Sequence, residues 1–350
     1  MQQNLATTDD QVPVYLSNYR QAQSDTTMMD YVKLGGFGKF YKEENIVEIQ
    51  SPNQYQIVRM NRDTLYAESI FNLTTSVTLT MPPTNGYYMS LQIIDEDNYI
   101  LGVIYPERQA QKTVKIIYNP DPNKKSTNQT IYSTTKYVFC LTRTLVNPSN
   151  QTDLARARAL QNNLRVQQAT KGEFVIQNWN LDQMNEIRNS VSSLIVYVQP
   201  GAAVNGYRGK IDPTYQLIGT AAGWGGLPPQ DAVYQAFFPQ NNVDDLVYYI
   251  YVAPDSVPIY PIGFWSLTVY NATSYLQYNQ WNSYSLNSLT AKPETNGSYV
   301  LYFSSIGKKQ DYMTNWIWTY PGWNYLARLY TPKEQIIDLS WQFPPLIQLN

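Results

Sequence analysis

Hydrophobic and polar residues alternate with a period of two along several short stretches of this 350-residue chain. In TSVTLTM, residues 75–81, the side chains of Val77, Leu79 and Met81 fall on one face and small polar side chains fall on the other. The stretch MSLQIID, residues 89–95, repeats this pattern. Such alternation is typical of half-buried β-strands. The Pro, Asn and Gly residues between the stretches favour a sandwich or barrel over a parallel α/β sheet.

The C-terminal half has the same texture. Its segments 246–253, 263–272 and 297–305 are rich in aromatic and β-branched residues, which favour strands. Between the two halves the period changes to that of a helix. Residues 152–164 and 180–194 carry apolar stripes at helical spacing, so two helices are expected there.

Local signals predict where these helices begin and where others lie. Thr152 or Asp153 is expected to cap the first helix, and Asn180 the second. A third, short helix is expected over QDAVYQAFF, because this stretch follows Pro228 and Pro229. The first 55 residues lack a regular pattern, and their glycine cluster KLGGFGKF is interpreted as a turn.

Together these patterns predict a mainly β protein with helical insertions. A chain of this length suits two domains, each large enough to bury its own core. We expect an N-terminal β-sandwich module with an irregular N-terminal arm over 1–150, a helical connector over 151–200, and a C-terminal β-sandwich module over 201–350.

Composition and charge exclude several classes of function. The formal net charge is −2 and the basic residues are scattered, so nucleic-acid binding is not expected. No apolar run approaches the length of a membrane span. The N-terminal residues lack the basic and apolar parts of a signal peptide. We therefore expect an intracellular or virion protein rather than a classically secreted one, unless a leader has been removed.

The chain has no histidine and a single cysteine, Cys140. One cysteine cannot form an intrachain disulfide or a thiol metal cluster. The lack of histidine excludes Ser-His-Asp and Cys-His nucleophile systems and His-ligated metals. Any catalysis must therefore use Asp, Glu, Lys, Tyr, Ser or Thr, and these absences favour a protein that is not an enzyme.

A polar run, Asn61-Arg62-Asp63-Thr64, lies directly before an apolar stretch. In an extended segment, alternation places Asn61 and Asp63 on one side, where buried polar groups would need partners. Either these side chains tie the backbone together, with Arg143 or Arg328 as partners, or they face a ligand. Arg328, between apolar neighbours on one strand face, is expected to be a structural anchor.

Acidic residues suggest two further sites. Asp95, Glu96 and Asp97 end a strand and could hold Ca²⁺ through oxygen ligands, or they could form a solvated acidic turn. No other cofactor is expected. Asp63, Glu68, Asp95 and Glu96 lie on consecutive segments and could converge as the carboxylate pair that glycoside hydrolysis requires.

Aromatic residues are unusually frequent, with 31 Tyr and 8 Trp. The stretch NWIWTYPGWNY, residues 315–325, concentrates five of them. If these rings are exposed, they would form a stacking platform for sugars or a surface for a partner. If they are buried, they belong to the core.

Several of these motifs resemble a paired family whose two modules are catalogued as domains of unknown function 1254 and 1214. In the first module, the family pattern of Asn followed by Asp-Thr-Leu-Tyr is matched by Asn61 and residues 63–66, including Tyr66. Its closing Arg-Thr strand and Asp-Leu helix match Arg143-Thr144 and Asp153-Leu154. The resemblance covers roughly residues 55–165 and 225–350.

The second module resembles the family more strongly. Its Phe-Trp-Ser-Leu-Thr-Val-Tyr signature is matched at residues 264–270, its Asn-Trp element at Asn315 and Trp316, and its Arg-Leu-Tyr-x-Pro element by Arg328 to Tyr330 and beyond. The chain also departs from the pattern, because Ser283 replaces an arginine that is usual before a Tyr-Ser pair.

The resemblance implies jelly-roll-like β-sandwich modules with helical insertions and no established activity. It places nine residues in one ligand-binding or structural polar cluster, namely Asn61, Arg62, Asp63, Tyr66, Arg143, Asn315, Trp316, Arg328 and Tyr330. Family members occur in bacteria and large DNA viruses. Two functions are therefore expected to compete: a structural or binding protein that associates with itself or with other proteins of a viral particle, and a carbohydrate-binding or carbohydrate-hydrolysing protein whose partner is a glycan.

Overall fold

The computed structural model describes residues 6–46, 49, 59–199, 201–243 and 246–349. These residues form a mainly β protein, which confirms the predicted fold class. They divide into two compact units, each assembled from separate parts of the chain. The N-terminal unit contains Met1–Glu44, Leu65–Leu145 and Ala155–Pro229, and the C-terminal unit contains Asn45–Thr64, Val146–Leu154 and Gln230–Asn350.

This division differs from the expected boundaries at 150 and 200. Most of the helical stretch expected to connect two modules belongs to the N-terminal unit, and that unit continues to Pro229. Conversely, the polar run Asn61–Thr64 belongs to the C-terminal unit. Sequence patterns report local structure, whereas this division depends on which distant segments pack together.

The N-terminal unit contains two larger sheets and a two-stranded pair. In spatial order, the five-stranded sheet consists of β2 (Tyr41–Lys42), β3 (Thr64–Asn72), β9 (Tyr137–Leu145), β5 (Met89–Asp95) and β6 (Ile100–Ile104). The four-stranded sheet consists of β10 (Arg165–Gln168), β4 (Val77–Met81), β7 (Lys112–Tyr118) and β8 (Thr130–Ser133). The pair is β1 (Ala6–Val12) with β11 (Val175–Trp179).

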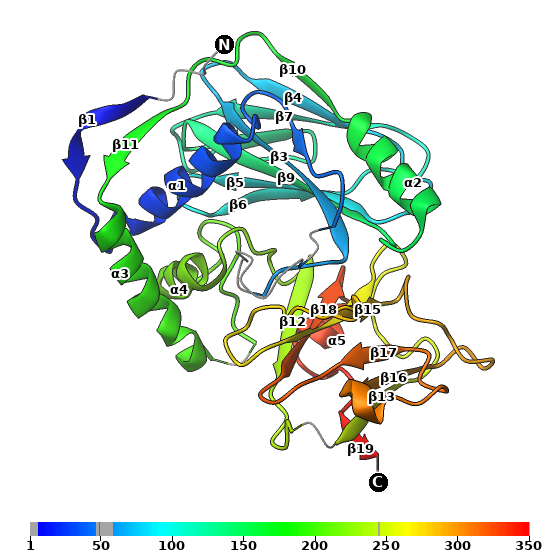
Figure 1. The fold of residues 1–350 in the computed structure, drawn as a ribbon. Coiled ribbons are helices and arrows are strands. Elements are labelled where there is room, and N and C mark those ends of the chain that lie inside the picture. The colour runs from blue at the N-terminus through cyan, green and yellow to red at the C-terminus, as the bar shows by residue number, and fades with distance from the viewer. Residues whose placement is uncertain (1–5, 47–48, 50–58, 200, 244–245, 350) are drawn as a thin grey trace. The chain divides into compact units, whose positions relative to one another are not determined.

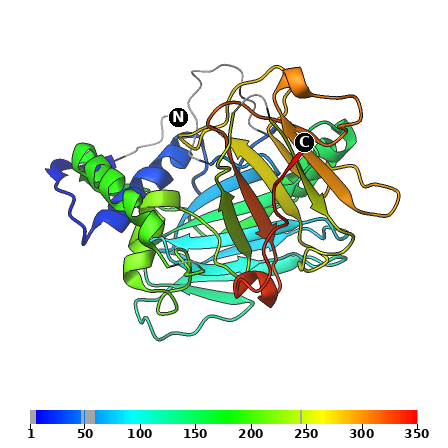
Figure 2. The same cartoon turned by 90° about the horizontal axis from the view of Figure 1, so that it is seen from below.

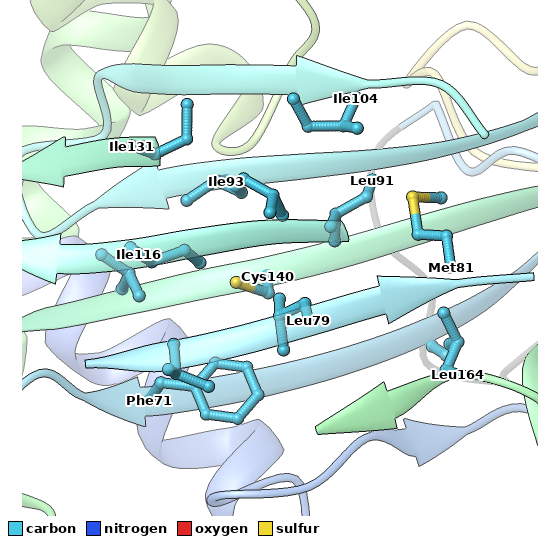
Figure 3. Close-up of a cluster of buried hydrophobic side chains, with 14 of the residues drawn as sticks. Phe71, Leu79, Met81, Leu91, Ile93, Ile104, Ile116, Ile131, Cys140 and Leu164 are labelled. Atoms are coloured by element: carbon cyan, nitrogen blue, oxygen red, sulfur yellow. The ribbon is translucent and has the colours of Figure 1, made fainter. Parts of the chain in front are cut away.

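One apolar core joins the two larger sheets. Figure 3 shows Leu91, Ile93 and Cys140 from the five-stranded sheet in the same cluster as Leu79 and Ile116 from the four-stranded sheet. The predicted alternation appears directly in β4, where Val77, Leu79 and Met81 are buried and the residues between them are half-buried. Burial of these apolar faces is the main stabilising contribution to the unit. The jelly-roll strand order remains a prediction.

Helices gather on one side of the N-terminal unit in both views (Figures 1 and 2). They are α1 (Tyr19–Lys33), α3 (Leu181–Ser192) and α4 (Pro213–Gly223), with the 3₁₀ turn η1 (Ser193–Tyr197) following α3. The Asn180 side chain accepts from the Gln183 N–H, as predicted for the cap of α3. α1 and α4 were missed because their buried faces include polar residues, such as Asp25 in α1 and Gln216 in α4.

Two local predictions need correction. α2 (Gln151–Asn162) begins one residue before the expected caps, and Asn150 Oδ1 accepts the N–H groups of Thr152 and Asp153. The third expected helix is instead β12 (Ala232–Phe237), which pairs with β18 over six residues. Strand pairing supplies more backbone hydrogen bonds there than one short helix could, so tertiary context overrides the local signal. The glycine cluster is a turn after α1, with φ +96° at Gly35.

The C-terminal unit contains two four-stranded sheets. The first consists of β12, β18 (Asn324–Tyr330), β14 (Trp265–Tyr270) and β15 (Ser285–Asn287). The second consists of β17 (Trp316–Trp318), β16 (Tyr299–Ser304), β13 (Val247–Val252) and β19 (Ile347–Leu349). A 3₁₀ turn η2 (Ile306–Lys308) and a short helix α5 (Glu334–Ile337) complete it. Leu267, Ala327 and Leu329 from the first sheet share a core with Ile250 and Phe303 from the second.

No helix among the described residues is both long and apolar enough to span a bilayer.

Candidate functional sites

The segment before β3 is tied to the C-terminal unit by side-chain hydrogen bonds. Asn61 Nδ2 donates to the Tyr330 hydroxyl at 3.0 Å, and Asn61 Oδ1 accepts the Asp63 N–H at 2.6 Å. Asp63 is fully buried, and its Oδ1 accepts a hydrogen bond of 3.0 Å from Asn287 Nδ2. The polar residues of the run therefore have the partners that burial requires.

Arg328 places a buried positive charge beside this segment. Its guanidinium donates to Thr268 Oγ1 at 2.9 Å, to the Tyr270 hydroxyl at 2.6 Å and to the Arg59 carbonyl oxygen at 2.8 Å. Burial alone would lower the pKa of Arg328, but the neighbouring phenols and Asp63 raise it above its ordinary value. Burial raises the pKa of Asp63, and the charge of Arg328 opposes that rise. The arrangement has the character of an internal tie.

Other predicted residues of the C-terminal unit also have structural contacts. The Arg62 guanidinium lies 4.4 Å from the centre of the Tyr284 ring. Asn315 is buried, and its side chain bonds the Lys292 backbone in both directions, at 2.7 and 2.8 Å. Trp316 is half-buried, and its Nε1 donates to Ser304 Oγ at 2.9 Å.

Tyr66 and Arg143 lie in the N-terminal unit, so the nine residues predicted as one cluster are divided between the two units. Arg143 is on β9 and donates to Gln92 Oε1 and, at 3.1 Å, to the Gly225 carbonyl oxygen. Gln92 Nε2 in turn donates to the Gly226 carbonyl oxygen at 2.9 Å. These bonds anchor the loop after α4 on the five-stranded sheet.

The acidic triplet after β5 is used by the protein itself. Asp95 Oδ1 accepts the N–H groups of Asp97 and Tyr99, and Arg208 donates to Asp95 Oδ2 at 2.7 Å and to Asp97 Oδ2 at 2.8 Å. Glu96 Oε2 accepts the Tyr137 N–H at 2.9 Å. In the described part of the chain, no three acidic or cysteine residues converge to hold a metal. The geometry adds no support for Ca²⁺ at this triplet.

Two carboxyl groups near this triplet titrate close to neutrality. Asp25 on α1 is almost fully buried, and burial raises its pKa to about 7 although Trp179 Nε1 donates to it at 2.9 Å. Burial raises the pKa of Glu96 to about 8, and the nearby charge of Asp25 adds to the rise. Both groups therefore keep their protons well above the pH at which ordinary carboxyls lose them.

A second carboxyl cluster, which we call the Glu43–Glu68 pair, lies on the helix-facing side of the five-stranded sheet. Glu68 is in the middle of β3 and 1% exposed, and burial, followed by the charge of Glu43, raises its pKa well above the ordinary value. Burial raises the pKa of Glu43 to about 7. Tyr31 on α1 senses both carboxylates and Arg143, so it borders the same space.

The sequence contains a signal for this pair that the earlier reading did not use. In TLYAESIFN, Glu68 is the one charged residue of a strand whose neighbours are apolar or small. A charge in a buried strand requires a partner or a function. Glu68 was instead grouped with Asp63, Asp95 and Glu96, but its carboxylate neighbour is Glu43, which precedes it by 25 positions and sits just after β2.

Aromatic side chains form a row on the outer face of the second sheet of the C-terminal unit. Tyr249 on β13 pairs with Tyr302 on β16, which pairs with Trp316 on β17 (Figure 1). Trp318 follows on the same face of β17, since the residue between them, Ile317, points into the core. We call Tyr249, Tyr302, Trp316 and Trp318 the aromatic row.

The row continues to a tryptophan outside the sheet. Trp281 is 38% exposed, and its ring centre lies 6.0 Å from that of Trp316 and 5.6 Å from that of Trp318. Lys309 Nζ lies 5.5 Å from the Trp316 ring centre. The two alternatives for residues 315–325 are therefore both realised, because Trp323 and Tyr325 are core residues while Trp316 and Trp318 lie on the outer face.

Comparison with protein families identifies two regions. Residues 44–168 match "Protein of unknown function (DUF1254)", and residues 240–334 match "Protein of unknown function (DUF1214)". The resemblance predicted from the sequence motifs is confirmed. No protein with a curated description matches the sequence significantly.

Two solved structures share the fold. The VPA0106 protein from Vibrio parahaemolyticus has a TM-score of 0.69 and 15% identity, with 96% of this chain and 98% of that chain covered. An uncharacterised protein from Burkholderia cenocepacia has a TM-score of 0.50 and 12% identity, with 96% and 86% covered. At such identities the likeness concerns the fold alone.

Replacing Arg328 tests the tie in the C-terminal unit. Arg328→Met removes three donors and leaves Asp63 buried without its nearby cation, so the free energy of unfolding should fall by about 3–5 kcal/mol. Chemical denaturation followed by tryptophan fluorescence measures the change. The exposed Lys308→Met is the matched control and should change stability by less than about 0.5 kcal/mol. A loss below about 1 kcal/mol in Arg328→Met would contradict the tie.

The raised carboxyl pKa values predict an inverted pH dependence of stability. The unfolded chain releases these protons near pH 4, whereas folded Asp25 and Glu96 hold them to about pH 7 and about pH 8. The folded state binds more protons in that window, so the stability of the N-terminal unit should fall as pH rises from about 5 to about 8, by at most about 1.4 kcal/mol per pH unit for each group. Glu96→Gln should flatten this slope in denaturation curves, and the exposed Glu173→Gln should not. An unchanged slope in Glu96→Gln would count against the assignment.

Proposed function

The chain belongs to the family that carries the domains of unknown function 1254 and 1214 in tandem, and from this premise we propose that it is a non-enzymatic binding protein that recognises a neutral glycan. The observation that carries this proposal is the aromatic row of the C-terminal unit together with Trp281.

The geometry of the row suits an extended ligand. Directly paired residues on neighbouring strands place Tyr249, Tyr302 and Trp316 side by side across three strands. Strand spacing is about 4.8 Å, so the three side chains span roughly 10 Å of the sheet surface. Each is anchored on a rigid strand, so little ordering would accompany binding.

The chemistry of the row suits a sugar. Every ring in the row has an apolar face and also a hydroxyl or indole N–H, which suits a ligand with C–H faces and a rim of hydroxyl groups. Lys309 is the cation packed against this surface, on Trp316, and it offers a further donor to hydroxyl oxygens. The lack of histidine leaves ligand binding by stacking and hydrogen bonding untouched.

Removing the row tests the glycan proposal. Wild-type protein should bind at least one of cellohexaose, xylohexaose and chitohexaose, and Trp316→Ala/Trp318→Ala should weaken that binding at least about tenfold, as expected from losing two ring contacts of about 0.5–1.5 kcal/mol each. Isothermal titration calorimetry measures both. Tyr260→Ala is the control, because Tyr260 is an exposed tyrosine outside the row. The glycan proposal fails if none of the three binds or if the double variant binds equally well.

A second candidate is a structural role through self-association, as expected of a particle component. The turn η1 after α3 exposes four consecutive apolar residues, including Val196 at 75% and Tyr197 at 81%. Contiguous apolar exposure of this kind marks interaction surfaces. This observation concerns the N-terminal unit and is independent of the aromatic row.

Sedimentation velocity tests the second candidate. If η1 mediates assembly, wild-type protein should sediment as an oligomer, and Val196→Ser/Tyr197→Ser should sediment as a monomer with an unchanged circular dichroism spectrum. Trp316→Ala/Trp318→Ala should still associate, because it leaves η1 intact. A wild-type monomer at all concentrations tested would end the assembly proposal and leave glycan binding unaffected.

A further inference from the structure

We propose that the Glu43–Glu68 pair is a binding site for a primary ammonium group, such as that of a small amine or a lysine side chain. The site lies in the N-terminal unit and takes a ligand of different charge and chemistry from the proposed glycan.

An unpartnered buried oxygen points to a ligand. Glu68 is 1% exposed, and its Oε2 has no hydrogen-bond partner among the described residues. Leaving a buried acceptor unsatisfied costs about 1–3 kcal/mol, more for a charged group. Proteins keep such groups mainly where something else binds. Glu68 lies on the same face of β3 as Tyr66, two positions away, and its charge acts on Glu43 and Tyr31.

The cluster is not sealed from solvent. Glu43, Tyr31 and Tyr66 each keep part of their surface exposed, whereas Glu68 is enclosed. Each comes from a different place in the unit: Tyr31 from α1, Glu43 from the end of β2, and Tyr66 and Glu68 from β3. A small group could therefore approach past the tyrosines and reach the buried carboxyl at the far end.

Charge complementarity selects a cation. The ionisable groups that face the pair are Tyr31 from α1, Tyr66 from β3 and Arg143 from β9. With both carboxyls ionised and the tyrosines neutral, two negative charges face the single positive charge of Arg143. That guanidinium is also held by Gln92 and the Gly225 carbonyl, so it does not move to neutralise the pair. One further positive charge would balance the cluster.

Hydrogen-bonding chemistry narrows the cation to an ammonium. The pair offers carboxylate oxygens and phenol oxygens, which accept hydrogen bonds, and an ammonium has three donors and no acceptor. Its positive charge would also be favoured over the faces of Tyr31 and Tyr66. An anionic ligand would face the carboxylates and is excluded by charge. A divalent metal would require more converging ligands than these residues supply.

The proposal has a thermodynamic signature that distinguishes it from other ligands. Burial and mutual repulsion keep protons on the pair near neutrality, with a pKa of about 7 for Glu43 and a raised pKa for Glu68. An ammonium needs the ionised forms, so its binding must release protons into the buffer. Affinity should therefore rise as pH rises from about 6 to about 8, until the pair is ionised without the ligand.

Calorimetry with the full chain tests the site. Ethylamine and butane-1,4-diamine are titrated at pH 6 and pH 8, each in two buffers of different ionisation enthalpy, which reveals the protons released. Wild-type protein should bind an amine with proton release at pH 6 and more tightly at pH 8. Glu68→Gln keeps the shape of the side chain but cannot carry the charge, so it should weaken binding about ten- to a hundredfold and reduce proton release. Glu44→Gln is the control, because Glu44 is exposed and next to Glu43.

Each other outcome overturns the proposal. It fails if neither amine binds, if Glu68→Gln binds amines as wild-type does, or if glycerol binds as tightly as the amines. Glu43→Gln is the second variant and should also weaken amine binding should Glu68→Gln fail to fold. Glycan binding by the aromatic row would be unaffected in either variant, so the two proposals can fail separately.

Discussion

Charge inside a β-rich core is the constraint on which the polar architecture of this protein depends. Arg328 keeps its proton at any physiological pH, so the residues around it must supply acceptors, and the carbonyl of Arg59 and the hydroxyls of Thr268 and Tyr270 do so. Asp63 is enclosed beside it and bonded by Asn287. Once such a charge is buried, each neighbouring polar residue has its position prescribed.

The two units satisfy this constraint in different ways. In the C-terminal unit, the buried acid and base lie near one another and both have neutral hydrogen-bond partners. In the N-terminal unit, Arg143 is engaged by Gln92 and a loop carbonyl, while Glu68 is left beside another acid. A tie holds the backbone in place, whereas an excess of acid creates a place where a cation is favoured. The second arrangement is therefore the chemically active one.

Sequence patterns predicted the local structure better than the sites. Strand β4 and helix α3 followed from periodicity and from the cap at Asn180, because these signals depend on neighbours in the chain. The motif-based cluster failed to stay together, since Tyr66 and Arg143 fold into one unit and Asn61 and Arg328 into the other. The Glu43–Glu68 pair and the aromatic row arise from strand register and from helix packing, which are set by contacts between distant segments.

The interleaved division of the chain has a consequence for synthesis. The segment containing Asp63 leaves the ribosome early, but its partner Asn287 comes 224 residues later and Tyr330 comes 269 residues after Asn61. Until then, a polar, charged stretch next to β3 must wait without the groups that will enclose it. Long-range closure of this kind is slow, and a fragment released before the last strands would hold an incomplete C-terminal unit. Translation must therefore reach nearly the last codon before this part of the molecule can mature.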